Sequence, residues 1–327
     1  MGDVTMGFPA RRIGMKLILG TMTFGESVFS PEVGMFIDCF LGSGNTEIDT
    51  AYVYNEGRCE TLLGEVLPQE RRPYTIATKV NPNVTGRLDG EAAYMQVKES
   101  LRRMNRDSVD IVYLHFPDSQ TPVESVLEAM DNLHREGRFT ELGLSNFPAW
   151  MVADVWHRCA AHGWVEPTVY EGIYNPLTRK AETELDACIS AYGLRFYAYN
   201  PLAGGLLTGR YGKFEDAPED GRFTHRANYR SRFWKRSYFD AIALLKEACA
   251  KEGVPVAEAT YRWLAYHSML KEERGDGIII GASKLSHLVD NMESQKGGPL
   301  PNALLEAFEA AWSICKADSP DYFRLFR

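Results

Sequence analysis

Four polar residues of the chain fall where short β-rich runs are expected to end. Asp49 closes one such run and Tyr54 follows five residues later, while Lys79 and His115 close the next two runs. A carboxylate, a phenol, an amine and an imidazole are together the groups needed to protonate a carbonyl oxygen without a metal ion. The four residues therefore predict a site for acid-assisted carbonyl chemistry.

Each of the four side chains has an expected role in that chemistry. A free tyrosine has a pKa of about 10, so we expect the Lys79 ammonium to stabilise the Tyr54 phenolate and lower its pKa. Asp49 would keep Lys79 protonated, and His115 would donate a hydrogen bond to the carbonyl oxygen. No side chain can deliver a hydride, so a nicotinamide cofactor is implied. Singly, each residue has an ordinary structural explanation, and their joint placement is what favours catalysis.

Eight β-rich runs, each followed by a helical stretch, predict how these residues are brought together. The first seven runs start 27 to 35 residues apart, about the length of one βα unit. Their apolar centres are typical of strands buried on both faces. We predict an α/β fold, a closed (β/α)8 TIM barrel forming a single domain over residues 1–327, in preference to a doubly wound open sheet. The runs are 16–22, 46–49, 75–80, 110–115, 139–145, 167–172, 194–200 and 277–282.

Local signals add detail to this barrel. Thr121 and Glu124 form a capping-box pattern at the start of one helix. After the seventh run we expect a loop near 203–236 and then a helix from about Phe239. Loops that follow barrel strands lie on the catalytic face, so this loop is expected to cover the pocket. The chain after Pro301 predicts one amphipathic helix and then an extended tail, which we also place over the catalytic face.

The ends of the later runs suggest a cofactor-binding surface. Ser145 and Asn146 close the fifth run and could hold the carboxamide of a nicotinamide. Tyr199 could stack on the nicotinamide ring, although a core aromatic is the ordinary interpretation. The segment 201–210 is rich in glycine, which lets backbone amides approach phosphate oxygens, although a plain turn is the alternative.

The segment after the eighth run adds two candidates for binding anions. Ser283 is expected to cap the helix that follows, and the N-terminus of a helix attracts anions. Lys284 adds a positive charge suited to a 2′-phosphate, which favours NADP over NAD. A solvated surface lysine is the alternative.

One basic run departs from the acidic average of the chain. Residues 222–236 carry six cations and no carboxylate: Arg222, Arg226, Arg230, Arg232, Lys235 and Arg236. A solvated face is the usual explanation for such a run. In a loop that covers the pocket, it could instead hold cofactor phosphates or an acidic substrate.

Composition excludes several classes of function. A net charge of −8 argues against a nucleic-acid-binding surface. The six cysteines are scattered without metal-ligand spacing, which favours a reduced cytoplasmic protein. No apolar run reaches the roughly 18 residues of a membrane span, and residues 1–17 lack the apolar core of a secretory signal.

Together with the four polar residues, several motifs resemble the aldo-keto reductase superfamily over nearly the whole chain. They include GLSN at 143–146, YNPLAGGLLTG at 199–209 and the GAS…N stretch after the eighth run. Within the superfamily, TPVESVLEA and PDYFR are similar to the aflatoxin aldehyde reductase branch, which also reduces succinic semialdehyde.

The resemblance implies a (β/α)8 barrel, NADPH (bound as NADPH or NADP+), tyrosine-assisted reduction of a small-molecule carbonyl and a possible homodimer. It implies substrate contacts at His115, Tyr229, Arg232 and Arg324, the last three suited to a carboxylate. The residues expected to contact the cofactor are Asp49, Ser145, Asn146, Glu171, Tyr199, Asn200, Pro201, Leu202, Gly204, Gly205, Leu207, Gly209, Arg210, Ser283, Lys284, His287 and Asn291.

The chain departs from this family pattern in two places. Glu171 stands where the family normally has Gln against the nicotinamide carboxamide. An ionised Glu accepts but cannot donate, and it favours a cationic ring, so we expect weaker NADPH selectivity or a balance shifted toward oxidation. In addition, Leu325, Phe326 and Arg327 follow the PDYFR arginine and are expected to narrow the pocket.

Two other functions stay open at this point. A metal-dependent barrel hydrolase or isomerase could use Asp49, His115 and Glu171 as ligands, but it would leave Tyr54 and Lys79 unexplained. A non-catalytic, nucleotide-sensing auxiliary subunit of the same fold is compatible with all four residues. Turnover of a carbonyl substrate would separate an enzyme from such a subunit.

Overall fold

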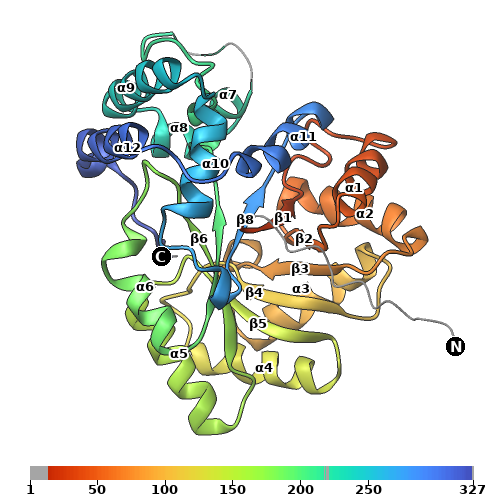
Figure 1. The fold of residues 1–327 in the computed structure, drawn as a ribbon. Coiled ribbons are helices and arrows are strands. Elements are labelled where there is room, and N and C mark those ends of the chain that lie inside the picture. The colour runs from red at the N-terminus through yellow and green to blue at the C-terminus, as the bar shows by residue number, and fades with distance from the viewer. Residues whose placement is uncertain (1–13, 217, 219–220, 326–327) are drawn as a thin grey trace, which may run out of the picture.

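Eight parallel strands close into a barrel at the centre of the molecule, and helices surround it (Figure 1). The computed structural model describes residues 14–216, 218 and 221–325. Strand β1 pairs in parallel with both β2 and β8, which closes the ring. The predicted (β/α)8 barrel is confirmed. Its strands are β1 (Lys16–Gly20), β2 (Glu47–Asp49), β3 (Thr75–Val80), β4 (Val109–Leu114), β5 (Phe139–Ser145), β6 (Pro167–Ile173), β7 (Arg195–Tyr199) and β8 (Gly277–Ile280).

Each of the first six strands is followed by a helix that returns the chain to the start of the next strand (Figure 1). In the third of these helices, Asp89 accepts a hydrogen bond from Ala92 N at 2.9 Å, and Arg102 and Arg103 complement the last turn. The helices are α1 (Glu32–Gly42), α2 (Arg58–Val66), α3 (Gly90–Arg103), α4 (Val123–Arg135), α5 (Ala149–His162) and α6 (Ala181–Ala191).

The capping box expected at the start of α4 is wrong. Pro122 occupies the N-cap position, and no side chain caps the helix. The Thr121 hydroxyl instead donates to Asp118 Oδ2 at 2.5 Å, and the same carboxylate accepts the backbone N–H of Leu88 at 2.9 Å. The Thr121 hydroxyl is therefore hydrogen-bonded to Asp118 in the preceding loop and does not cap the helix.

The segment between β7 and β8 is more helical than predicted. The expected loop at 203–236 contains α7 (Arg222–His225) and α8 (Ala227–Phe233). Helix α9 (Arg236–Glu252) begins three residues before the predicted start, and α10 (Val256–Tyr266) follows it. Helix α11 (Leu285–Glu293) follows β8. The predicted C-terminal helix is present as α12 (Asn302–Cys315) and lies beside α9 (Figure 1).

The barrel interior is filled by side chains, which support the polar residues at one end. The apolar layer consists of Ile18, Ala77, Ile111, Tyr113, Val169, Tyr197 and Ile279. A Cβ atom on Gly143 of β5 would lie 2.3 Å from the Tyr113 ring, so this large aromatic fits only against glycine. Lys79 Nζ lies 5.4 Å from the centroid of the same ring, so Tyr113 forms the base on which the lysine rests.

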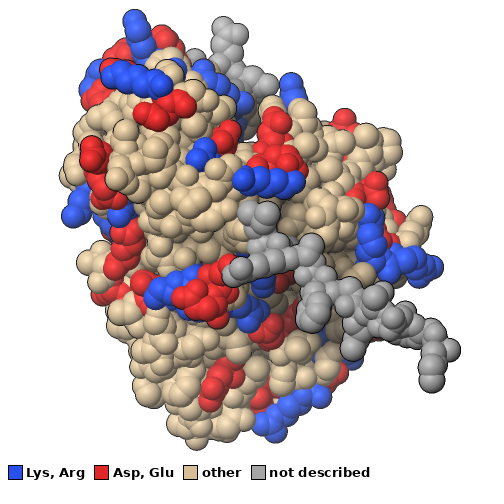
Figure 2. All heavy atoms as spheres, in the orientation of Figure 1, with Lys and Arg blue, Asp and Glu red and all other residues tan. Residues whose placement is uncertain are grey.

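Charged side chains of both signs are interspersed on the face of the molecule shown in Figure 2. Among the described residues, no helix is both long and apolar enough to cross a membrane. Most of the segment expected to lack a secretory signal falls in residues 1–13, outside the described part of the chain.

Candidate active site

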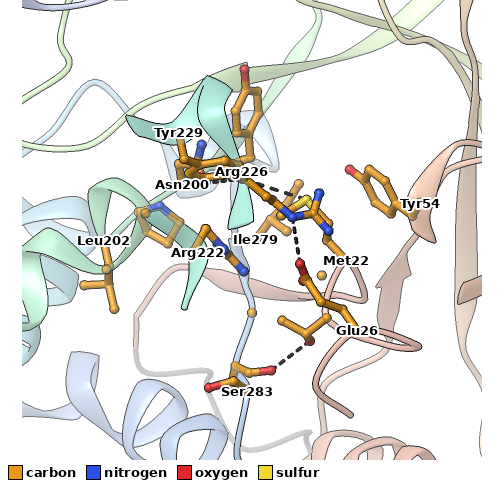
Figure 3. Close-up of a pocket in the computed structure, with 18 of the residues that line it drawn as sticks. Met22, Glu26, Tyr54, Asn200, Leu202, Arg222, Arg226, Tyr229, Ile279 and Ser283 are labelled. Atoms are coloured by element: carbon orange, nitrogen blue, oxygen red, sulfur yellow. Dashed lines mark hydrogen bonds and ion pairs between the residues drawn. The ribbon is translucent and has the colours of Figure 1, made fainter. Parts of the chain in front are cut away.

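The carboxyl ends of the strands open into one cavity of about 1340 Å³. Loops after β1, β2, β7 and β8 line it, together with the short helices α7 and α8 (Figure 3). The loop after β4 adds His115 and Phe116 to the lining. The loop after β7 was predicted to cover the pocket, and it does. The catalytic face of a (β/α)8 barrel is the same carboxyl-terminal face.

Lys79 lies at the bottom of this cavity, completely buried. Its ammonium group donates to a carboxylate oxygen of Asp49 and, at 2.8 Å, to the backbone oxygen of Thr50. A second carboxylate oxygen, Oε2 of Glu171, lies 3.2 Å away. Burial alone would lower the pKa of Lys79, but the two carboxyl groups outweigh it and raise that pKa. The lysine therefore stays charged at neutral pH.

The Tyr54 phenol lies above this ion cluster, with Lys79 Nζ 5.3 Å from its ring centroid. A tight turn, η1 (Tyr54–Gly57), holds the residue: Asn55 adopts a φ of 48° and donates to the backbone oxygens of Met22 and Phe24, both at 2.8 Å. The expectation of a lowered Tyr54 pKa is wrong, because the net shift is upward. Burial raises the pKa of Tyr54 well above its usual value, and Asp49 and Glu171 raise it further. The phenol therefore keeps its proton.

His115 presents a protonated nitrogen to the same space. Asn83 N donates to Asn81 Oδ1 at 2.9 Å, which directs the Asn81 amide nitrogen to His115 Nδ1 at 3.1 Å. Because an amide NH2 group only donates, Nδ1 accepts and the imidazole proton lies on Nε2. Burial and the nearby charges of Lys79 and Arg324 hold the His115 pKa well below its usual value. The neutral ring lies 6.0 Å from the Tyr54 ring, centroid to centroid.

Asn81 was missed by the sequence analysis. It directly follows β3, and it also lines the cavity. A polar residue just after the strand that ends in Lys79 was an available signal, because strand ends had already yielded the other candidates. Its hydrogen bond fixes which nitrogen of His115 can donate.

Asn146 connects the ends of three strands. Its amide nitrogen donates to His115 O at 3.0 Å and to Ser145 Oγ at 2.9 Å, and its Oδ1 accepts the Tyr199 hydroxyl at 2.7 Å. The backbone N–H of Arg324 donates to Asn146 O at 3.1 Å, so the C-terminal tail is tied to the same residue. The left-handed backbone of Asn146, with φ 61°, makes this arrangement possible.

The loop after β7 forms an open cradle. Asn200 Nδ2 is buried there, and none of the residues that the structure describes forms a hydrogen bond with it. Gly204 has φ 70°, and a Cβ atom at this position would lie 2.9 Å from the Tyr229 ring, so the loop can pack on Tyr229 only with glycine here. Gly205, with φ 106°, keeps open space on its outer side.

Ser283 does not cap the helix after β8, contrary to expectation. The N-cap of α11 is Lys284, whose backbone is extended, and no side chain accepts from the first turn. The amide groups of that turn are therefore left available to a ligand anion. Ser283, Lys284, His287 and Asn291 all line the cavity.

Most residues predicted to contact a cofactor or substrate line this one cavity. Four predicted residues do not: Lys79, Ser145, Leu207 and Gly209. Lys79 and Ser145 are completely buried beneath lining residues, and the Leu207 side chain points into the hydrophobic core. Gly209 ends the short 3-10 helix η4 (Ala203–Thr208) with φ 74° and lies against Val256.

The basic run divides into two parts. Arg222, Arg226 and Arg232 line the cavity. Lys235 and Arg236 face elsewhere, toward Asp318 O and Glu215.

The sequence analysis missed an ion pair that joins the loop after β1 to Arg226, the residue between α7 and α8. Arg226 Nε lies 2.9 Å from Glu26 Oε1, and Arg226 Nη2 donates to Asn55 Oδ1 at 2.9 Å (Figure 3). Glu26 and Arg226 are 200 residues apart, so no local pattern indicates the pair.

Three residues expected to contact the substrate form one wall. Arg232 lies 5.7 Å from the Tyr229 ring and Arg324 lies 5.2 Å from the Phe116 ring. Neither arginine forms an ion pair with any residue that the structure describes. The Tyr229 hydroxyl donates to Asn200 Oδ1 at 3.1 Å. Leu325 is exposed and outside the cavity lining, while Phe326 and Arg327 lie outside the described residues.

The proposed metal ligands do not form a metal site. Within the described part of the chain, no group of three or more His, Cys, Asp or Glu side chains is arranged to hold a metal ion. The Lys79 ammonium occupies the place between the Asp49 and Glu171 carboxyls where such an ion would bind. The residues therefore do not suit a metal-dependent hydrolase.

Comparison with known proteins identifies the family. The model of the Aldo/keto reductase family matches residues 16–313. The chain belongs to this family. As an aldo/keto reductase it is an oxidoreductase, and it is similar to the human aflatoxin B1 aldehyde reductase member 2, with 43% identity over 94% of this chain and 89% of the relative.

Two further relatives cover nearly the whole chain. Human aldo-keto reductase family 7 member A3 is 43% identical, over 94% of this chain and 96% of its own length. The oxidoreductase sirO of Leptosphaeria maculans is 32% identical over the same shares of the two chains.

Proposed function

We propose that this protein reduces an aldehyde or ketone to an alcohol, with NADPH as the hydride donor. The observation that carries the proposal is the convergence of Tyr54, Lys79, Asp49 and His115 at the carboxyl end of the barrel. Tyr54 retains its phenolic proton, and His115 directs an N–H group into the same cavity. Two donors can therefore reach one carbonyl oxygen.

Each residue would contribute a distinct part of the reaction. Tyr54 donates the proton to the carbonyl oxygen, and His115 Nε2 orients that oxygen by a hydrogen bond. Lys79 stabilises the phenolate that forms, and Asp49 holds the ammonium in place through their ion pair. When bound, NADPH supplies the hydride that no side chain can provide.

Several features of the cavity suit a dinucleotide phosphate. The buried Asn200 Nδ2 lacks a hydrogen-bond partner among the described residues, and the glycines that follow leave room beside the backbone. The first turn of α11 is uncapped, with the exposed Lys284 beside it. We place the nicotinamide near Asn146, Glu171 and Tyr199 and the phosphates along 200–210 and 283–291. Lys284 favours NADPH over NADH.

The wall formed by Tyr229, Arg232 and Arg324 supports a substrate that carries a carboxylate. Two cations without carboxylate partners can form charge-assisted hydrogen bonds with such a group. The relatives named as aldehyde reductases support an aldehyde as the reacting group. We therefore propose short aldehydes with a terminal carboxylate as preferred substrates. A homodimer and a cytoplasmic location stay predictions.

A screen of cofactor oxidation tests this proposal. The purified protein is mixed with NADPH or NADH and with succinic semialdehyde, 4-nitrobenzaldehyde or an unbranched aldehyde that lacks the carboxylate. We expect oxidation of NADPH in preference to NADH, fastest with the carboxylated aldehyde. Tight binding of NADPH without turnover of any aldehyde would favour the nucleotide-sensing subunit, and no binding of either nucleotide would contradict the proposal.

A further inference from the structure

The Glu171 carboxyl is a buried charged group at the barrel mouth that shares its one cation, Lys79, with a second carboxyl. The residue lies near the carboxyl end of β6, where it lines the cavity, and is only 3% exposed. Its Oε2 forms an ion pair with Lys79 Nζ at 3.2 Å, but no hydrogen bond of good geometry reaches it from the described residues. A buried carboxylate that shares its cation with a second carboxylate is unfavourable, so the site favours a proton on one of the two carboxyls.

The groups that face Glu171 from the neighbouring elements provide one positive charge for two carboxyls. Asp49 on β2 and Lys79 on β3 are the charged neighbours. Three phenols also lie within its electrostatic reach: Tyr54 on the turn after β2, Tyr113 on β4 and Tyr199 on β7. If both carboxyls were ionised, this buried cluster would carry one uncompensated negative charge.

The cluster is neutral when one of the two carboxyls carries a proton. Burial raises the pKa of Asp49 as well, but the charge and hydrogen bond of Lys79 oppose that rise. Burial first, and then the negative charge of Asp49, raise the pKa of Glu171 to about 8. The raised pKa favours a protonated Glu171 at neutral pH, in contrast to the ionised form expected from the sequence. A protonated carboxyl has one donor and one acceptor, as an amide side chain has.

We propose that Glu171 couples the charge of the bound nicotinamide to a proton. Binding of the cationic, oxidised ring releases the Glu171 proton to solvent, whereas binding of the neutral, reduced ring leaves that proton in place. This inference rests on the proposed function, because it requires the nicotinamide to bind at the barrel mouth. No bond of the cofactor changes: the carboxyl becomes a carboxylate, and one proton leaves through the open cavity.

The position of the ring follows from the chemistry of the site. A carbonyl held by Tyr54 and His115 must present its carbon to the hydride donor, so the nicotinamide lies at the same strand ends. Asp49, Asn146 and Glu171 line the cavity there. A cation near a carboxyl stabilises its ionised form and lowers its pKa. A neutral ring has no such effect, so the carboxyl distinguishes the two redox forms by their charge.

Linkage gives the size and sign of the effect. The affinity for NADP+ should increase about tenfold per pH unit between the pKa of Glu171 in the complex and its pKa in the free protein. Above the free value of about 8, the affinity should be constant. The affinity for NADPH should show no such increase. The dissociation constant of NADP+ divided by that of NADPH should therefore fall as pH rises toward 8.

Equilibrium titrations test the proposal without turnover. The dissociation constants of NADP+ and NADPH are measured by protein fluorescence from about pH 6 to pH 9 for the wild type and for Glu171→Gln. The 2′-phosphate titrates at a pKa of about 6, but both cofactors carry it, so its contribution cancels in the ratio. We expect a ratio that falls tenfold or more in the wild type and is constant in Glu171→Gln.

A matched control and a second measurement strengthen the test. Glu26→Gln removes another carboxylate that lines the cavity but is paired with Arg226, and it should keep the wild-type slope. Calorimetry of the wild type in two buffers of different ionisation enthalpy needs no variant. Near pH 7 it should show more proton release with NADP+ than with NADPH, since the 2′-phosphate contributes equally to both.

The outcomes separate the inference from the function on which it rests. A constant ratio in the wild type, or the same slope in Glu171→Gln, would overturn the coupling while leaving carbonyl reduction intact. Equal proton release with both cofactors would also overturn the coupling. If neither cofactor binds, the proposed function fails as well.

Discussion

The two ends of the barrel use the same side-chain types for opposite purposes. At the amino ends of the strands, Lys16 Nζ pairs with Glu47 at 2.7 Å, and Arg195 holds both oxygens of Glu141 at 2.7 and 2.8 Å. Both cations also donate to the Tyr197 hydroxyl, at 3.3 and 2.9 Å. Each cation at this floor therefore has its own carboxylate and shares one phenol.

The carboxyl ends lack this balance. Lys79 serves both Asp49 and Glu171, and no hydrogen bond of good geometry from the described residues reaches one Glu171 oxygen. Arg232 and Arg324 lie against aromatic rings instead of carboxylates. Charges without protein partners can bind a ligand at the carboxyl ends. The charges at the amino ends are fully paired, so they stabilise that end of the barrel and are not available to a ligand.

The pKa shifts of two glutamates show the consequence. Burial acts to raise the pKa of Glu141, but hydrogen bonds from Arg195 and Thr168 outweigh it and lower that pKa. Burial also raises the pKa of Glu171, and there it prevails, because the one nearby cation is shared with Asp49. The partners, and not burial alone, decide which carboxyl carries a proton.

The largest expected difference between the two ends concerns their tyrosines. Tyr54→Phe should lower kcat by about 10²- to 10⁴-fold, because it removes the proton donor, and it should leave NADPH binding intact. Tyr197→Phe should leave kcat unchanged and reduce the free energy of unfolding by about 1 kcal/mol. Steady-state oxidation of NADPH and a fluorescence titration measure both variants. Near-normal turnover by Tyr54→Phe would contradict the acid role.

The second-largest expected difference concerns the two lysines, Lys79 and Lys16, and is a difference in the free energy of unfolding. Lys79→Met leaves a buried Asp49 carboxylate without its partner and should lower the free energy of unfolding by about 3–5 kcal/mol. Lys16→Met breaks a partly exposed pair and should cost about 1 kcal/mol or less. Urea unfolding at neutral pH compares them. Equal losses of unfolding free energy in the two variants would mean that the buried Asp49 and Glu171 carboxyls depend on Lys79 no more than Glu47 depends on Lys16.

The two glutamates should give opposite pH dependences of stability relative to their Gln variants. The folded pKa of Glu171 is raised, so its contribution is present in acid and is lost as pH rises from the unfolded value toward about 8. The folded pKa of Glu141 is lowered, so its contribution is present above the unfolded value and is lost as pH falls.

At neutral pH, Glu141→Gln should cost about 1.5–3 kcal/mol through its lost charge-assisted hydrogen bonds, and Glu171→Gln should cost less. The free energies of unfolding of the wild type, Glu141→Gln and Glu171→Gln, measured across the pH range, provide the check. Slopes of the same sign would remove the contrast between the two ends.

The smallest expected effect concerns the cations of the substrate wall. Arg324→Met should raise KM for a carboxylated aldehyde about tenfold, since it removes one charge-assisted contact of about 1.4 kcal/mol, and it should leave an uncharged aldehyde unaffected. Arg230→Met changes an exposed arginine of α8 that does not line the cavity, so it should alter neither. A similar rise in KM for both aldehydes would argue against carboxylate recognition.

The periodic parts of the molecule were predictable from the sequence. Buried parallel strands need apolar centres whatever lies around them, so eight such runs gave the barrel and the place of its strand ends. The convergence of Asp49, Lys79 and His115 could then be predicted, because polar groups at the carboxyl ends of barrel strands share one cavity. Asn81 was missed although it directly follows a strand, since its function depends on an orientation set by Asn83.

Features that depend on competing or distant partners could not be predicted. Asp118 takes the Thr121 hydroxyl that would have capped α4, and Glu26 pairs with Arg226 from 200 residues away. The pKa values of Tyr54 and Glu171 depend on burial and on the carboxyls that lie beside them, which only the assembled barrel determines. A sequence shows which groups are present but not how their charges balance.

Transfer of a labelled hydride tests the central proposal most directly. The wild-type protein is given NADPH with deuterium at the transferring position of C4 and an aldehyde in ordinary water, and the alcohol is analysed by mass spectrometry and NMR. We predict one deuterium on the carbinol carbon for each cofactor oxidised, with the hydroxyl proton supplied through Tyr54. An alcohol without deuterium at that carbon, or cofactor oxidation without alcohol, would contradict the account.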